Sequence, residues 1–206
     1  MFILTASRLK TAQQEIADSD AVMADLMARL PAAKLVRKQS PFHVLATSII
    51  NQQLSQKAAA AIENRIATLA PAPFNAVDIT QLPKEQLRQA GLSHRKIEYL
   101  HALAQAEING VLDEKQLNRL SDNEVVSQLT AIHGIGKWTA EMFLMFCLRR
   151  SNVLSLGDAG LLRAARMLYG NRLRGDDGEV LEKAAKKWHP WRTVGCYYLW
   201  RSLDKK

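Results

Sequence analysis

Hydrophobic positions recur at helical spacing along almost the whole chain. Ile97, Leu100, Leu103 and Ala104, for example, fall on one face of a segment that Ser93 is placed to cap. β-branched runs are scarce, and no stretch alternates apolar and polar residues over the length of a strand. The pattern therefore predicts an all-α protein of roughly ten short helices.

Capping residues place many of the predicted boundaries. Pro41, with Ser40 before it, begins a helix that runs to Gln53, and Ser55 precedes another that ends near Leu69. Ser121-Asp-Asn-Glu124 matches a capping box. Other helices are predicted over residues 5–16, 20–30, 83–90, 94–109, 137–148, 159–169, 177–188 and 191–203. We expect a single domain over residues 1–206, made of two helical lobes with a central cleft.

A sharp turn, Gly134-Ile-Gly136, lies between two of these helices. Two glycines one residue apart let the backbone turn tightly and leave its amides accessible. The next helix begins near Lys137, so its first N–H groups point back at the turn. Such amides bind phosphate without regard to sequence. The alternative is an ordinary tight turn between helices.

Further along the chain than this turn, Asp158 is the single carboxylate in the otherwise apolar segment 153–162. It stands directly before a predicted apolar helix. From the residues alone, a helix N-cap with no further role explains it well.

Charge and composition narrow the class of partner. The chain has 206 residues, of which 48% are hydrophobic and 23% charged, so it should bury a core. The net charge is +8, and residues 131–206 hold 14 Lys and Arg against 7 Asp and Glu. A basic half-chain favours a polyanion such as nucleic acid, although a solvated basic surface is the alternative.

The sequence gives little support for a metal-binding protein or a membrane protein. The two cysteines, Cys147 and Cys196, lie in apolar helical surroundings and predict buried thiols, too few for an iron–sulfur cluster. The five histidines lack metal-ligand spacing, so no metal site is expected. No run approaches the ~18 apolar residues of a membrane helix, and no signal segment is recognised. We expect a cytoplasmic protein, associated with the nucleoid if bacterial.

Residues 126–162 resemble the helix-hairpin-helix and Gly-Pro-Asp region of the DNA glycosylase superfamily. Ile132-His-Gly-Ile-Gly-Lys-Trp-Thr-Ala140 is similar to its hairpin, and Gly157-Asp158-Ala-Gly-Leu-Leu-Arg163 to its catalytic stretch. Further segments resemble the 3-methyladenine DNA glycosylase II (AlkA) branch. These are Ile49-Ile-Asn-Gln-Gln-Leu-Ser55, Gly91-Leu-Ser-His-Arg-Lys-Ile-Glu-Tyr99, Trp188-His-Pro-Trp-Arg-Thr193 and Tyr197-Tyr-Leu-Trp200.

The resemblance implies a monofunctional DNA-3-methyladenine glycosylase II. Some relatives carry an extra β-domain, for which we expect no room in 206 residues. Such an enzyme hydrolyses the N-glycosidic bond of flipped 3-methyladenine or 7-methylguanine during base excision repair. Its partner is double-stranded DNA containing alkylated bases, and a monomer is expected. Two alternatives stay open. One is a glycosylase for 1-methyladenine, 3-methylcytosine or hypoxanthine, and the other is a non-catalytic DNA-binding module.

The resemblance also implies a role for each site residue. Asp158 would stabilise positive charge on the deoxyribose and orient water. The DNA backbone would be held by Gly134, Gly136, Lys137 and Thr139. The base pocket would be lined by Trp138, Trp191 and Met142, since indole faces attract cationic alkylated purines. Both tryptophans have a core role as the alternative, and Trp188 and Trp200 are expected in the core.

Two further expectations concern the wedge and the mechanism. Gln53 and Leu54 would fill the gap left by the flipped base. A helix linker is the alternative for them. Trp138 stands where strand-cleaving relatives have a lysine, which predicts hydrolysis without lyase chemistry. No cofactor is required, although the resemblance allows a monovalent cation at backbone carbonyls between Leu129 and Ile135.

Overall fold

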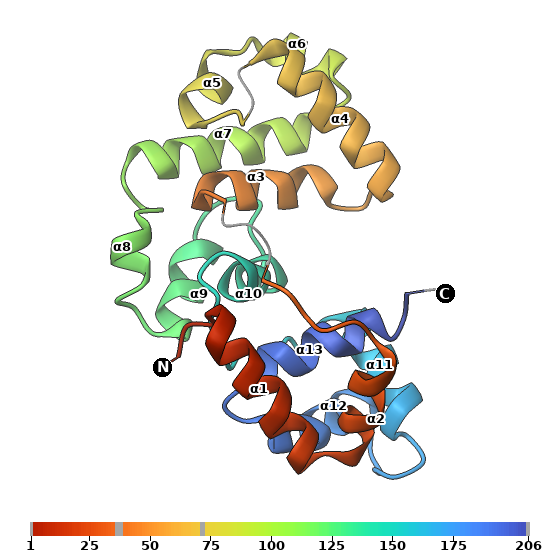
Figure 1. Cartoon of the computed structure of the whole chain (residues 1–206). Helices are drawn as coiled ribbons and strands as arrows, with labels where there is room; N and C mark the ends of the chain where they lie inside the picture. The colour runs from red at the N-terminus through yellow and green to blue at the C-terminus, as the bar shows by residue number, and fades with distance from the viewer. Residues whose placement is uncertain (1, 36–38, 71–72, 205–206) are drawn as a thin grey trace. The chain divides into compact units, whose positions relative to one another are not determined.

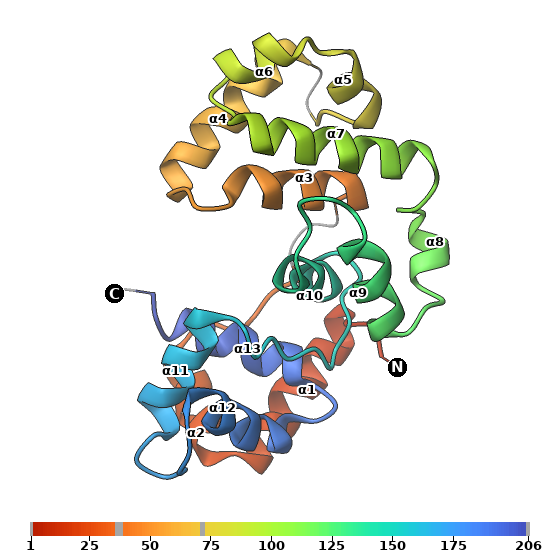
Figure 2. The same cartoon turned by 180° about the vertical axis from the view of Figure 1, so that it is seen from behind.

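The computed structural model describes residues 2–35, 39–70 and 73–204. Helices and connecting turns account for these residues, and the one extended pairing described among them is an isolated bridge between Ile3 and Arg150. The predicted all-α fold is confirmed. The chain divides into two compact units (Figures 1 and 2), which we call unit 1 (residues 1–37 and 148–206) and unit 2 (residues 38–147). A cleft between lobes stays a prediction.

Unit 2 is organised around α7 (His94–Ile108), whose apolar face is buried as its spacing predicts. α3 (Pro41–Asn51) runs along one side of α7 (Figure 1), and α5 (Ala76–Gln81) and α6 (Lys84–Gln89) also pack against it. The remaining helices of this unit are α4 (Gln56–Leu69), α8 (Glu114–Leu117), α9 (Asp122–Thr130) and α10 (Lys137–Phe146). α9 and α10 contact each other across the glycine-rich turn.

Side-chain caps set several boundaries in unit 2 as the sequence predicts. The hydroxyls of Ser40, Ser55 and Ser93 each accept a backbone N–H from the first turn of their helix. Ser121 and Glu124 form the predicted capping box of α9. Hydrogen bonds from the Ser121 hydroxyl and N–H lower the pKa of the Glu124 carboxyl. α9 is thereby fixed at its start and leads directly into the glycine-rich turn.

Unit 1 has the buried carboxylate of Asp20 at its centre. This group is 1% exposed and accepts hydrogen bonds from the Tyr169 hydroxyl at 2.8 Å and Trp188 Nε1 at 3.0 Å. Burial, and next the charge of Asp20, raise the pKa of Tyr169, which therefore stays a donor. The helices are α1 (Ala6–Ser19), α2 (Ala21–Arg29), α11 (Ala159–Tyr169), α12 (Asp177–Ala185), the 3₁₀ turn η1 (Lys186–Trp188) and α13 (Arg192–Arg201).

Several boundaries and elements differ from the prediction, and α1, for example, ends at Ser19 rather than at residue 16. α3 ends at Asn51 rather than Gln53, because the chain leaves helical geometry at Gln52, where ψ is 126°. The predicted helix over residues 177–188 divides into α12 and η1. The short helices α5 and α8 were not predicted, because six and four residues carry too little periodicity.

Both cysteines are buried thiols, as the sequence predicts. Burial raises the pKa of the Cys196 thiol, so this side chain stays protonated and acts as a core residue rather than a nucleophile. None of the helices in the described ranges is both long and apolar enough to cross a bilayer.

Candidate active site

The two glycines of the hairpin turn meet different requirements. Gly134 has φ +96°, and a Cβ added there would lie 2.2 Å from Cγ of Tyr99, on α7. Gly136 has φ −92°, and an added Cβ would meet nothing within 4 Å. Gly134 therefore lets the turn lie against the Tyr99 ring, which also contacts His133 edge-on at 4.8 Å. Gly136 leaves the start of α10 uncovered.

The N-terminus of α10 has the properties of an anion site. Gly136 provides no side-chain cap, and the first N–H groups of an α-helix lack intrahelical acceptors. The Lys137 side chain is 79% exposed, with Nζ 3.9 Å from Oε1 of Glu141. The backbone N–H of Thr139 also belongs to this first turn. The residue is 4% exposed, so its hydroxyl is buried.

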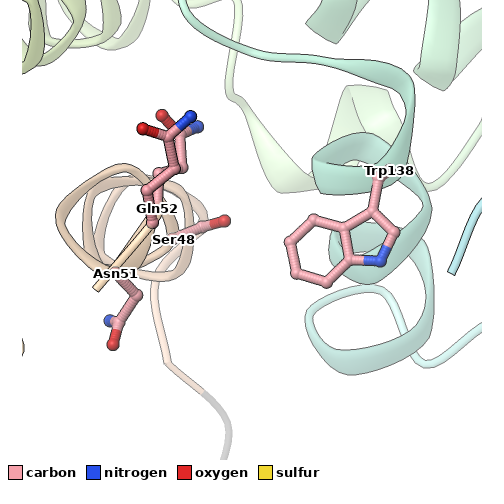
Figure 3. A pocket seen from close by; sticks show the side chains of 5 residues that line it. Ser48, Asn51, Gln52 and Trp138 are labelled. Carbon is pink, nitrogen blue, oxygen red and sulfur yellow. The ribbon is translucent and has the colours of Figure 1, made fainter. Parts of the chain in front are cut away.

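Trp138 forms one wall of a pocket in unit 2. Its side chain is 45% exposed, which excludes the core interpretation. The pocket has a volume of about 450 Å³ and is lined by Ser48, Asn51, Gln52, Gln53 and Trp138. Figure 3 shows the Ser48 hydroxyl directed toward the indole, whereas Asn51 points away from it. Met142 is half-buried one turn further along α10 and is not part of this lining.

The turn after α3 carries the wedge candidates. Gln53 has φ +58°, which is uncommon for a residue with a Cβ, and its side chain is exposed. Leu54 is 40% exposed. Gln52 Nε2 donates to the Gly134 carbonyl at 3.2 Å, which ties this turn to the hairpin. Unusual backbone conformations of this kind persist where the surroundings hold them, often at functional sites.

Asp158 lies in unit 1 and is 7% exposed. It is the N-cap of α11, so the capping role expected from the residues alone is confirmed. Its Oδ1 accepts hydrogen bonds from the Leu161 N–H at 2.7 Å and from Trp200 Nε1 at 2.9 Å. Two donors on one oxygen fix the orientation of the carboxylate.

Trp200 was expected only to fill the core, and that prediction is wrong. The residue is half-buried, and its indole N–H donates a hydrogen bond to Asp158. Gly160 makes room for this contact, because an added Cβ would lie 3.1 Å from Asp158 Oδ1 and 3.2 Å from Trp200 Cδ1. Nothing in the sequence around Trp200 distinguishes it from the buried Trp188.

Trp191 is 7% exposed and stays within unit 1. Its ring stacks on Phe2 with centroids 5.6 Å apart, and its Nε1 donates to Glu15 Oε2 at 2.6 Å. These contacts match the core alternative, since a base reaches the Phe2-covered face only if that ring moves. A base-contacting role for Trp191 stays a prediction.

Each unit thus brings together part of the predicted site. Unit 2 places the hairpin glycines, Trp138 and the turn of Gln53 side by side, and unit 1 places Asp158 against Trp200. The approach of Asp158 to the hairpin stays a prediction.

Comparison with known proteins places this geometry among DNA repair proteins. Residues 46–190 match the family described as HhH-GPD superfamily base excision DNA repair protein. The chain is 35% identical over 173 residues to DNA-3-methyladenine glycosylase 1 of Schizosaccharomyces pombe, covering 81% of this chain and 74% of that protein. The crystal structure of a DNA-3-methyladenine glycosidase from Bacillus halodurans is similar at 41% identity, with a TM-score of 0.83 over 93% of this chain and 88% of that one. The structure of Schizosaccharomyces pombe Mag1 in complex with abasic DNA is similar at 30% identity, with a TM-score of 0.81 over 93% of this chain and 96% of that one.

Proposed function

The chain belongs to the HhH-GPD superfamily of base excision DNA repair proteins, and from this premise we propose that it releases alkylated purines from double-stranded DNA. The proposed substrates are 3-methyladenine and 7-methylguanine, whose N-glycosidic bonds it hydrolyses. The observation that carries the proposal is the half-exposed indole of Trp138 on a pocket beside the hairpin. An electron-rich ring face attracts a purine that alkylation has made cationic.

Asp158 is the proposed catalytic residue. As the glycosidic bond breaks, its electron pair leaves with the base and neutralises the alkylated ring, while positive charge develops on the sugar. The carboxylate of Asp158 stabilises that charge and orients the water whose oxygen bonds to C1′, and the proton lost by this water passes to solvent. Its fixed orientation, set by Leu161 and Trp200, supports this role because a preoriented charge needs no rearrangement during the reaction.

The hairpin is the proposed grip on the DNA backbone. The N–H groups at the start of α10 donate hydrogen bonds to a phosphate where Gly136 leaves them uncovered, and the exposed Lys137 ammonium adds charge. Gly134 shapes the turn. Thr139 takes part through its backbone N–H, since its side chain is buried. Gln53, which lines the Trp138 pocket, and its neighbour Leu54 fill the gap that the flipped base leaves.

The chemistry proposed here requires no cofactor and no iron–sulfur cluster. A monovalent cation at the hairpin fits the donor set. The Ile132 carbonyl accepts a backbone N–H within the turn, and a carbonyl oxygen has a second lone pair. A cation there would hold the turn's carbonyls together and leave the reaction at the sugar to Asp158.

Analysis of the released bases tests the function. Methylated duplex DNA, and a duplex that contains hypoxanthine, are incubated with the protein, and mass spectrometry identifies the bases set free. We expect 3-methyladenine and 7-methylguanine. Release of 1-methyladenine, 3-methylcytosine or hypoxanthine alone would favour a glycosylase of other specificity. Binding to DNA without release of any base would favour the non-catalytic module.

We predict that borohydride traps no covalent complex between this protein and DNA during base release. A Schiff base with the sugar needs an amine at the reacting carbon, and the hairpin position that bears it in lyases is Trp138 here. The measurement is a denaturing gel of reactions with borohydride, beside a lysine-bearing lyase of the superfamily as positive control. A trapped band that requires the alkylated base would show the monofunctional assignment to be mistaken.

Trp200→Phe should slow base release about tenfold, because the variant loses one of the two charge-directed hydrogen bonds that orient Asp158. The rate is measured in single turnover, per folded protein. The matched control is Trp188→Phe, which removes an indole donor from the buried Asp20 and should cost stability without slowing the chemistry. An unchanged rate in Trp200→Phe would count against the positioning role.

A further inference from the structure

Lys96 reaches from α7 to the end of α3. Its Nζ donates to the carbonyl of Ile50 at 2.6 Å and to that of Gln52 at 2.7 Å. The side chain is half-buried, and this burial lowers the pKa of its amine. The last carbonyls of an α-helix have no intrahelical donor, and here one ammonium serves two of them. Lys96 is therefore a capping group for α3, delivered from a different helix.

The clamped carbonyls immediately precede the wedge candidates. Gln53 then adopts φ +58°, and the N–H of Leu54 returns to the Asn51 carbonyl at 3.1 Å. A residue with a Cβ keeps a left-handed backbone only where its neighbours hold it. Lys96 on one side and the Gln52 contact to Gly134 on the other both anchor this turn.

The positive charge of Lys96 suits this position for a second reason. A helix C-terminus carries partial negative charge. The C-terminus of α3 lies at the turn that is proposed to enter DNA. Without a hydrogen-bond donor, the two carbonyls there would face the negatively charged DNA. An ammonium shared between them neutralises the helix end, and a charge engaged by two acceptors is poorly placed to act as a phosphate contact itself.

We propose that Lys96 is the positioning residue of the DNA wedge. It holds the carbonyls of Ile50 and Gln52 and so fixes Gln53 and Leu54 in the conformation that fills the gap in the duplex. The inference rests on the proposed glycosylase function and adds to it a residue that acts through the turn rather than on the base.

A comparison of duplex and single-stranded substrates tests the inference. Flipping from a duplex leaves a gap that the wedge must hold, whereas a single strand has no pairing to replace. Lys96→Met should therefore lower the single-turnover rate on duplex DNA about tenfold or more, and change the rate on the single strand by less than about twofold. Gln53→Ala should show the same split. Arg95→Met, an exposed neighbour with the same change of charge, is the matched control and should show no split.

A second readout follows the wedge itself. With 2-aminopurine beside the alkylated base, the wild type should raise its fluorescence on binding duplex DNA, and Lys96→Met should not. Thermal unfolding establishes that the variants are folded. If Lys96→Met does not fold, Lys96→Arg is used. This variant keeps the positive charge, but its larger planar guanidinium cannot make the two hydrogen bonds in the same geometry.

The outcomes separate the inference from the function on which it rests. Equal loss on both substrates would reduce Lys96 to a general structural role, and no loss on either would overturn the proposal outright. A wild type that releases no base from either substrate would instead refute the proposed function.

Discussion

Asp158→Asn should reduce base release by at least about a hundredfold, the scale of losing one well-placed electrostatic group. The amide has nearly the same shape as the carboxylate but carries no charge to stabilise the sugar cation. Its oxygen still accepts from Leu161 and Trp200, and asparagine is a good N-cap. The variant should therefore fold as stably as the wild type and bind DNA at least as well, because one negative charge is gone.

Asp158→Ala is the control that separates chemistry from capping. It removes the acceptor of two donors at the buried start of α11, and it should cost about 1–3 kcal/mol of stability. Rates of base release, DNA affinity and unfolding midpoints are measured for all three proteins. If Asp158→Asn keeps the full rate, the catalytic group lies elsewhere and Asp158 is a cap alone.

Local signals account for what could be predicted of the fold. The Ser93 cap with the apolar spacing of α7, and the capping box of Ser121 and Glu124, act within one or two turns of a helix, so the sequence contains the whole signal. The unpredicted α5 has its own capping box, Asn75 with Asp78. It carries six residues, however, and so short a segment lacks the repeat that distinguishes a helix from a turn.

The candidate site shows the same difference between local signals and long-range contacts. The hairpin and Asp158 were found as contiguous motifs, whereas the residues that support them come from distant segments. Trp200 is 42 residues from Asp158, and Lys96 is 44 residues from Gln52. Neither contact has a local pattern. The tryptophans show the same limit, since the sequence cannot tell that Trp191 is covered by Phe2 while Trp138 is 45% exposed.

Gly134→Ala should destabilise unit 2 by about 2–4 kcal/mol, the combined scale of a left-handed backbone and an overpacked contact. The new Cβ would lie 2.2 Å from Tyr99 Cγ and 2.6 Å from Tyr99 Cβ, so rotation of the ring cannot relieve the clash. The turn must move, and with it the start of α10. Affinity for DNA should therefore fall together with stability, as measured by thermal unfolding and fluorescence anisotropy.

Gly136→Ala is the matched comparison at the other glycine. Its φ of −92° suits alanine and the added methyl meets nothing within 4 Å, so the unfolding midpoint should stay close to that of the wild type. The methyl nevertheless stands where the proposed phosphate contact approaches the amides of α10, and affinity for DNA should fall about tenfold, because glycine permits the closest approach of backbone to ligand. Loss of affinity at unchanged stability would show that the open space at Gly136 is occupied by DNA. Unchanged affinity would move the phosphate site away from this end of α10 and leave Gly136 as a residue of the turn only.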